Sequence, residues 1–268
     1  INIIKANSKK SNSDFFEAYI LLSLDSLKKN NIKESKEILA KIPKYLQEDR
    51  FNFIILNSLK EYVEVFNTKK IQKVNQNFGN LTFVSETFQR CYLDDKNTVS
   101  FFSKLINNSE TDYSRYTYFY ITYLIEKNQI EEAKAITEKL DYINTTLLLS
   151  QGKSWIENNE YQEFSKVFSC SNHNDILGEF LFLISNLYSS QNEFNKSNFY
   201  LNLSNFLNSK FVFNLSLIAE NFYLNKNYEK SKKILKNFDK NYNFYYWYRT
   251  KKEAQIISKT SNKKEGLN

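Results

Sequence analysis

The sequence predicts an all-α protein of antiparallel helix pairs that stack in a row. The first observation is a near-repeat within residues 180–238, where small and aromatic residues recur 34 positions apart. The repeated residues are Ser185, Tyr188, Phe194 and Ser197, followed by Ala219, Phe222, Tyr228 and Ser231. Such spacing is typical of two helices that pack against a copy of themselves. The second observation is that 268 residues include only four Gly and one Pro, far fewer than the turns of an all-β fold require.

Composition and charge indicate an ordinary folded chain, with 41% hydrophobic and 25% charged residues. The net charge is +7, and the lysines lie among acids, as at Lys69, Lys127 and Lys232. This pattern favours a solvated helical surface over a nucleic-acid or anionic-membrane face. No stretch of 18 apolar residues occurs, so no transmembrane helix is predicted. The sequence leaves open whether a signal peptide precedes Ile1.

The N-terminal part is expected to hold a polar segment at 1–13 and a divergent helical-repeat region at 14–110. Asp14 is a candidate N-cap, and Pro43 either ends the second helix or begins the next. Ser23 and Ser35 form a pair of small residues twelve positions apart. Helices are expected from Phe15 to a turn at Asn30-Asn31, and over Ile32–Ile42, Phe51–Phe66, Asn80–Tyr92 and Lys96–Ile106. A short helix around Ile71 and Val74 and a turn at Asn107-Asn108-Ser109 are also expected.

Residues 111–242 are expected to hold repeats in clear register. The expected helices are Tyr113–Lys127, Ile130–Leu140, Thr145–Asn158, Tyr161–Phe168, His173–Ser190, Phe194–Asn208, Phe211–Asn225 and Tyr228–Phe238. A capping helix at 243–259 then covers the exposed face of the last repeat, and a polar tail at 260–268 ends the chain. Together with the N-terminal part this makes one continuous solenoid.

The step into each second helix carries the repeat motif. The paired positions are Ile130 with Ala133, Tyr161 with Phe164, Phe194 with Ser197, and Tyr228 with Ser231. The first-helix positions expected to pack against them are Ile121, Gly152, Ser185 and Ala219, at spacings of 31, 33 and 34 residues. Where two helices cross closely, one side must be small.

This motif resembles the tetratricopeptide repeat family, whose unit is about 34 residues long. The resemblance covers residues 112–242 well, and it implies a right-handed superhelix, or α-solenoid, of helix pairs. Phe164 and Ile121 stand where the family has small residues, which predicts wider helix crossings there. The chain is also similar to tetratricopeptide-repeat proteins of alphaproteobacteria, which carry a C-terminal segment like Tyr245–Arg249. Because such relatives often begin with a secretory signal, the resemblance favours the periplasm over the cytoplasm if a signal peptide preceded Ile1.

The same resemblance implies a concave groove lined by the first helix of each pair. The groove residues that it implies are Tyr118, Thr122, Ile125, Lys153, Ile156, Phe182, Asn186, Ser189, Ser216, Glu220 and Tyr223. Aromatic anchors among amide and charged groups suit an extended peptide or a partner helix. The alternative is that these residues are half-exposed and bind nothing.

The cysteines and the single histidine give little indication of chemistry. A bridge between Cys91 and Cys170 is chemically allowed, but nothing in the sequence supports it, so both are expected to be small buried residues. His173 lies three residues after Cys170. A metal site would need a second Cys/His pair, and Cys–His catalysis would need an oxyanion-hole loop. We therefore expect no metal at these residues.

No other pattern indicates catalysis. The acid pairs Asp94/Asp95 and Glu131/Glu132 fall at loops or helix starts, where they complement the helix dipole. Neither a phosphate-binding loop nor a dinucleotide-binding glycine pattern occurs. We expect no enzyme and no cofactor, with a site in the irregular segment 67–110 as the remaining enzymatic alternative.

The aromatic run from Phe244 to Arg249 allows three interpretations. It can cap the last repeat, dock a protein, or stack nucleic-acid bases beside its cations. Five consecutive aromatic residues point all round a helix, so some must be buried and one or two exposed.

The leading functional hypothesis is a non-catalytic scaffold that binds a peptide or partner protein in its groove. The alternative is a helical-repeat nucleic-acid-binding protein that uses the net positive charge. The partner and the oligomeric state are not indicated.

Overall fold

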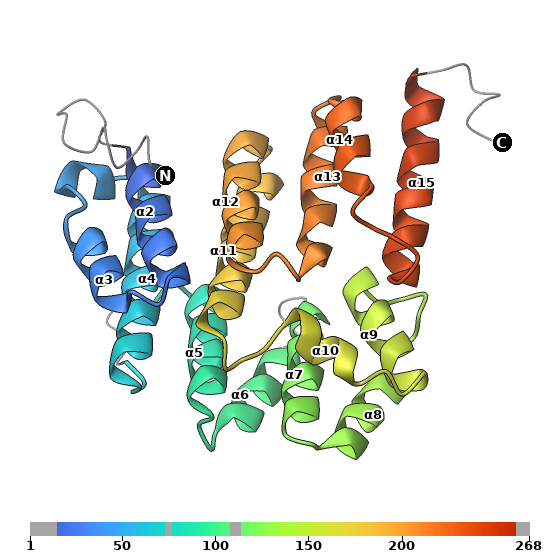
Figure 1. Cartoon of the computed structure of the whole chain (residues 1–268), viewed down its shortest axis with the longest axis horizontal. Coiled ribbons are helices and arrows are strands. Elements are labelled where there is room, and N and C mark those ends of the chain that lie inside the picture. Colours follow the sequence, from blue (N-terminus) through green and yellow to red (C-terminus); the bar gives the residue numbers. More distant parts are fainter. Residues whose placement is uncertain (1–14, 73–76, 108–113, 261–268) are drawn as a thin grey trace. The chain divides into compact units, whose positions relative to one another are not determined.

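The computed structural model describes residues 15–72, 77–107 and 114–260, and these ranges contain fourteen α-helices, two 3-10 helices and no strand. The predicted all-α class is confirmed (Figure 1). The chain folds into two compact units, one from residues 1–98 and 170–177 and the other from residues 99–169 and 178–268. The predictions for Asp14, Val74, the turn at 108–109 and the tail at 261–268 lie outside the described residues.

The first unit, unit 1, is a series of helices that pack on their chain neighbours. Its described elements are α2 (Phe16–Lys28), α3 (Ile32–Ala40), the 3-10 helix η1 (Lys44–Gln47), α4 (Arg50–Thr68), α5 (Asn80–Leu93) and the start of α11 (His173–Ser190). α2 packs on α3, α3 on α4, and α4 on α5. Pro43 is the residue before η1, so it begins an element instead of ending α3. Ile71 lies outside any helix, so the short helix predicted around Ile71 and Val74 does not include Ile71.

The second unit, unit 2, surrounds a core of aromatic rings. Its elements are α6 (Thr98–Ile106), α7 (Ser114–Glu126), α8 (Ile130–Glu138), α9 (Leu147–Glu157), α10 (Gln162–Val167), the rest of α11, α12 (Phe194–Leu207), the 3-10 helix η2 (Val212–Asn214), α13 (Leu215–Leu224), α14 (Tyr228–Leu235) and α15 (Asn243–Thr260). α7 packs on α8, α9 and α10, and α15 packs on α9 and α14. Phe119, Phe168 and Phe211 meet in the core, with ring centroids 4.6–6.2 Å apart.

Five helix pairs turn through the same backbone geometry. Just past the first helix the chain enters the left-handed region at Asn30, Asn128, Asn159, Asn192 and Lys226, with φ between 57° and 63°. Asn adopts this conformation more readily than most residues other than Gly. The N–H of the following residue donates to the carbonyl five positions back, at 2.7–3.0 Å, which is the Schellman arrangement. The last four turns are spaced by 31, 33 and 34 residues, which matches the predicted register.

A sixth turn of this kind extends the register into the part of the chain where the sequence shows it poorly. Asp94 follows α5 with φ at 52°, 34 positions before Asn128. The N–H of Asp95 donates to the carbonyl of Arg90 at 3.0 Å. The turn therefore has the backbone pattern of the other five, although the side chains around it differ from theirs.

Small residues meet where the helices of a pair cross, as predicted. The hydroxyls of Ser23 and Ser35 lie 2.7 Å apart, and those of Ser185 and Ser197 lie 3.0 Å apart. In the last pair the hydroxyl of Ser231 donates to the carbonyl of Ala219 at 2.9 Å. All three contacts join residues twelve positions apart and are fully buried. Each of these buried hydroxyls therefore has a hydrogen-bond partner on the other helix, which the small side chains allow to come close.

The pair α9 and α10 makes room for a large side chain in another way. Phe164 stands at the position of the small residue, and Gly152 lies opposite it. A Cβ atom on Gly152 would lie 3.4 Å from the Phe164 ring and 3.1 Å from the ring of Tyr118. The missing side chain of Gly152 thus accommodates both rings.

Candidate functional site

The predicted groove residues on α7 and α9 are largely buried. Tyr118 and Thr122 are fully buried and Ile156 is 5% exposed, so the prediction that these three face a groove is wrong. The ring of Tyr118 stacks on Phe164 at 5.4 Å and meets Phe211 at 5.9 Å. Because α8, α9 and α10 all pack on α7, this face of α7 belongs to the core of unit 2.

The predicted groove residues on α13 contact α15. The hydroxyl of Tyr248 lies 3.3 Å from the carbonyl of Ser216 and 3.2 Å from Oε2 of Glu220. The ammonium of Lys252 pairs with Glu220 at 2.7 Å and lies 4.3 Å from the ring centroid of Tyr223. Helix α15 therefore occupies the surface that the sequence assigns to a partner.

The other predicted groove residues do not complete a groove. The guanidinium of Arg115 lies 3.7 Å from the ring centroid of Phe182, and Ser189 donates to Asn221 at 2.6 Å. Lys153 is half-buried and donates to the carbonyl of Thr137 at 2.9 Å. Ile125 is half-buried too, and Asn186 alone of the eleven predicted residues is exposed. The eleven residues therefore do not form one open surface.

A buried ion pair ties three elements of unit 2 together. Arg115 of α7 donates to both carboxylate oxygens of Glu179 on α11, at 2.7 and 2.6 Å, and to Oδ1 of Asn214 in η2 at 2.7 Å. The side chain of Glu179 is only 2% exposed. Burial raises the pKa of Glu179, and the charge of Arg115 opposes that rise. With its polar atoms paired in this way, the cluster acts as a structural clamp.

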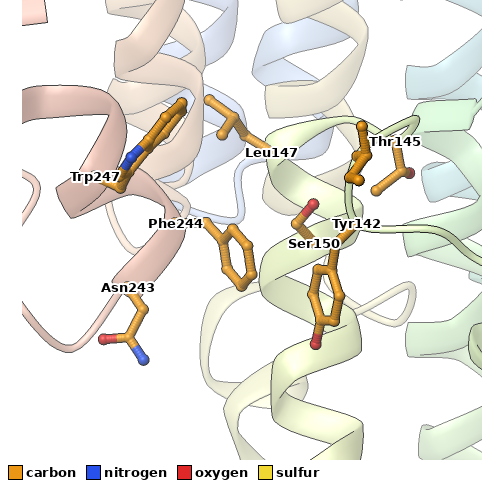
Figure 2. A pocket seen from close by; sticks show the side chains of 8 residues that line it. Tyr142, Thr145, Leu147, Ser150, Asn243, Phe244 and Trp247 are labelled. Atoms are coloured by element: carbon orange, nitrogen blue, oxygen red, sulfur yellow. The ribbon is translucent and has the colours of Figure 1, made fainter. Parts of the chain in front are cut away.

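An apolar pocket of about 510 Å³ lies in unit 2 between the start of α15 and the chain segment that enters α9. The residues that line it are Tyr142, Ile143, Thr145, Leu147, Ser150, Asn243, Phe244 and Trp247. Figure 2 shows Phe244 and Trp247 on one side, facing Leu147, Ser150 and Tyr142 on the other. Ile143 is 88% exposed and Trp247 is 57% exposed. Exposed apolar side chains of this size beside a hollow are typical of an interaction site.

The walls of the pocket are held by specific contacts. The rings of Tyr142 and Phe244 stack with centroids 5.2 Å apart. The hydroxyl of Tyr142 hydrogen-bonds Glu157, which lowers the pKa of that carboxyl. The backbone N–H of Phe244 donates to Oε1 of Gln151 at 3.4 Å. These contacts fix the start of α15 against α9, so the pocket is formed before any ligand binds.

The lining of the pocket offers apolar surface and uncharged hydrogen-bonding groups. It contains no carboxylate, amine, imidazole or thiol, and its polar side chains are Tyr142, Thr145, Ser150 and Asn243. Phe244 and Trp247 belong to the aromatic run that the sequence singles out. The expected mixture of buried and exposed aromatic residues is found in this run, because Tyr245 is 3% exposed while Trp247 is 57% exposed. Tyr142 and Ile143 also line the pocket, but the sequence did not indicate them as site residues. The available signal was two large apolar residues in a loop that is otherwise polar.

The cysteines of unit 1 form a disulfide, which corrects the expectation of two unbridged residues. Cys91 and Cys170 are bonded, with Cα atoms 5.4 Å apart, and both are buried as expected. Cys170 therefore has no free thiol to act with His173. The Nε2 atom of His173 lies 3.1 Å from the carbonyl oxygen of Leu27, and its ring lies 5.4 Å from that of Phe66. Burial lowers the pKa of His173.

The described parts of the chain contain neither a cluster of metal-ligating residues nor a membrane-spanning helix. These residues hold no group of three or more His, Cys, Asp and Glu placed to bind a metal ion. None of their helices combines the length and the apolar character that crossing a bilayer needs. Comparisons of the chain with protein-family models, with curated proteins and with solved structures found no match.

Proposed function

We propose that this chain is a non-catalytic scaffold that binds a protein partner through the apolar pocket of unit 2. The observation that carries the proposal is a preformed pocket of about 510 Å³ beside Trp247, which is 57% exposed. Exposed aromatic residues at the edge of a pocket are the groups that dominate binding energy at protein interfaces. The partner contributes an apolar side chain to the pocket, and Thr145, Ser150 and Asn243 orient its backbone.

The architecture that we propose is a tetratricopeptide-like α-solenoid with α15 as its capping helix. The recurring Schellman turns and the pairs of small residues support this assignment, because both recur at the spacing of helix-pair repeats. We place the partner-binding site in the pocket and not in the predicted groove, because Tyr118, Thr122 and Ile156 are buried.

A photo-crosslinking residue placed at Ile143 tests this function. Ile143 is 88% exposed, so Ile143→p-benzoylphenylalanine leaves the fold intact and puts the reactive group at the pocket rim. We expect a discrete crosslinked partner in native lysate, and we expect it to disappear when Trp247→Ala is added. The matched control places the same group at Tyr45 in unit 1, which is 56% exposed. Equal crosslinking at both sites, or crosslinking that survives Trp247→Ala, would contradict the proposal.

A further inference from the structure

The net charge of the chain is concentrated at its C-terminal end. Residues 211–268 hold twelve Lys and Arg against five Asp and Glu, whereas residues 1–210 hold 25 of each. The whole net charge of +7 therefore belongs to residues 211–268. This corrects the expectation that the lysines lie scattered among acids, because acids are few in residues 211–268.

Much of this charge lies on and around helix α14, on a surface that we name the lysine face. It consists of five exposed lysines, Lys226, Lys230, Lys233, Lys236 and Lys240. Ser231 and Leu235 are the buried residues of α14, and helical spacing places Lys230 and Lys233 on the opposite side. Lys226 precedes the helix, while Lys236 and Lys240 follow it. The lysine face thus covers the outer side and both ends of α14.

Residues 226–240 hold six lysines against two acids, Glu229 and the exposed Asp239, so the lysine face keeps a net positive charge. Glu229, the acid within α14, pairs with Lys232 at 3.4 Å, and Glu220 pairs with Lys252 at 2.7 Å. None of the five lysines forms an ion pair with an acidic side chain of residues 15–72, 77–107 or 114–260. Like charges three or four positions apart on a helix repel one another. A partner of opposite charge would remove this repulsion.

We propose that the lysine face docks an acidic polypeptide segment of a protein partner, with Asp or Glu at three- and four-residue spacing. A helix with that spacing places its carboxylates about 5–6 Å apart, which is also the spacing of Lys230 and Lys233 along α14. The proposal concerns a surface separate from the pocket, and it does not depend on what the pocket binds.

Four observations favour a polypeptide over other polyanions. The lysine face contains no arginine, the residue whose planar fork reads phosphates and bases. The aromatic residues close to it in sequence, Phe222, Tyr228, Phe238 and Tyr242, are half-buried or buried and offer no open stacking platform. The Cys91–Cys170 disulfide is typical of oxidising compartments, away from cellular nucleic acid. The exposed large apolar residue closest in sequence to the lysine face is Leu224, which is 52% exposed. One such side chain buries too little apolar area to anchor the surface in a bilayer.

Fluorescence polarisation with defined probes tests the proposal on the full chain. The main probe is a labelled helical peptide with five Glu residues at three- and four-residue spacing, and its Glu→Gln counterpart is the reference. Because one exposed ion pair changes an affinity by about two- to fivefold, Lys→Gln at all five positions should weaken binding by about 30-fold at low salt. The matched control carries five Lys→Gln changes at exposed positions of unit 1, namely Lys33, Lys41, Lys44, Lys70 and Lys96. It should bind the peptide as tightly as the unchanged chain.

Two further probes decide between partner classes. They are a single-stranded DNA of about 20 nucleotides and vesicles of phosphatidylcholine with about 30% phosphatidylserine. Tighter binding of either probe than of the Glu peptide, lost on the same Lys→Gln changes, would replace the acidic partner by a nucleic acid or a membrane. Equal binding of the Glu and Gln peptides would refute the docking surface altogether. Circular dichroism confirms the fold of each variant, and Trp247→Ala should leave Glu-peptide binding unchanged.

Discussion

Tyr142 and Phe244 stack almost parallel, with ring centroids 5.2 Å apart and planes 9° apart, although they lie 102 positions apart in the chain. Tyr142 belongs to the loop before α9, and Phe244 belongs to the first turn of α15. The contact therefore joins the two walls of the pocket. Its loss should open the pocket without touching the core of unit 2.

We expect Phe244→Ala to lower the free energy of unfolding by about 1–3 kcal/mol, since a stacked pair adds about 1 kcal/mol to the area that the ring buries. Trp247→Ala is the matched variant, because Trp247 is 57% exposed, and it should stay within about 0.5 kcal/mol of the unchanged chain. Urea denaturation measures both. A larger loss for Trp247→Ala than for Phe244→Ala would show that the stacking contributes little.

Gly152→Ala should destabilise unit 2, even though Ala is favoured over Gly inside a helix by about 1 kcal/mol. The new Cβ would lie 3.1 Å from the Tyr118 ring, and that ring is held on its other sides by Phe164 and Phe211. Overpacking costs about 1–3 kcal/mol, so we expect a net loss of about 1 kcal/mol in thermal or urea unfolding.

Gly178→Ala is the control for that change. A Cβ on Gly178 would meet its nearest neighbour, the carbonyl oxygen of Ser204, at 3.4 Å. This is an ordinary contact distance, so the gain in helix propensity is retained and the variant should be neutral or slightly more stable. A ranking in which Gly178→Ala is the less stable of the two would contradict the packing argument.

Breaking the buried ion pair should be costly. Glu179→Gln removes the buried charge that pairs with Arg115, whose side chain is 19% exposed, and breaking a buried pair by removing one partner destabilises a protein by up to about 3–5 kcal/mol. Glu131→Gln breaks the exposed pair with Lys134, in which Glu131 is 83% exposed, and should leave the free energy of unfolding nearly unchanged. The double variant Arg115→Met with Glu179→Leu should recover much of the lost stability. If the double variant is no more stable than Glu179→Gln, then the clamp stabilises unit 2 through its packing and not through the pairing of charges.

The stability of unit 1 should fall as the pH falls through and below about 6.5. Burial lowers the pKa of His173 from its ordinary value of 6.5, so the unfolded chain binds a proton before the folded chain does. The contribution of His173 to the free energy of unfolding is therefore fully present above its ordinary pKa. It is lost as the pH drops toward the lower pKa that His173 has in the folded chain. His173 is the only histidine, so any histidine contribution to urea midpoints measured between about pH 5 and pH 7.5 comes from this residue. His173→Gln should flatten that part of the profile, and an unchanged slope would assign it to carboxylates.

Local features of the fold could be predicted from the sequence because they depend on residues close together in the chain. The contact of Ser185 with Ser197 spans a single helix pair, and the turn at Asn192 lies between them. Both follow from spacing and from the tolerance of Asn for the left-handed region. The mixture of buried Tyr245 and exposed Trp247 likewise follows from the geometry of one helix.

Features that depend on distant segments could not be predicted. The burial of Tyr118 requires Phe211, which lies 93 positions away, and the repeat spacing contains no information about that contact. The pocket requires the loop at Tyr142 to meet Phe244. The partner of Cys91 lies 79 residues away, and two cysteines alone do not say whether they meet. Placing the binding surface in a groove failed because the core and α15 already occupy it.

The Cys91–Cys170 bond also makes the backbone between the two cysteines a closed covalent ring. A protease that cuts once anywhere in residues 92–169 therefore yields two fragments that still migrate as one molecule until a thiol reductant is added. Linking residues 79 apart also restricts the unfolded chain by about 4–5 kcal/mol in the chain-entropy account. A nicked and oxidised molecule would thus retain both of its pieces, so that damage to the backbone inside the ring need not release either fragment.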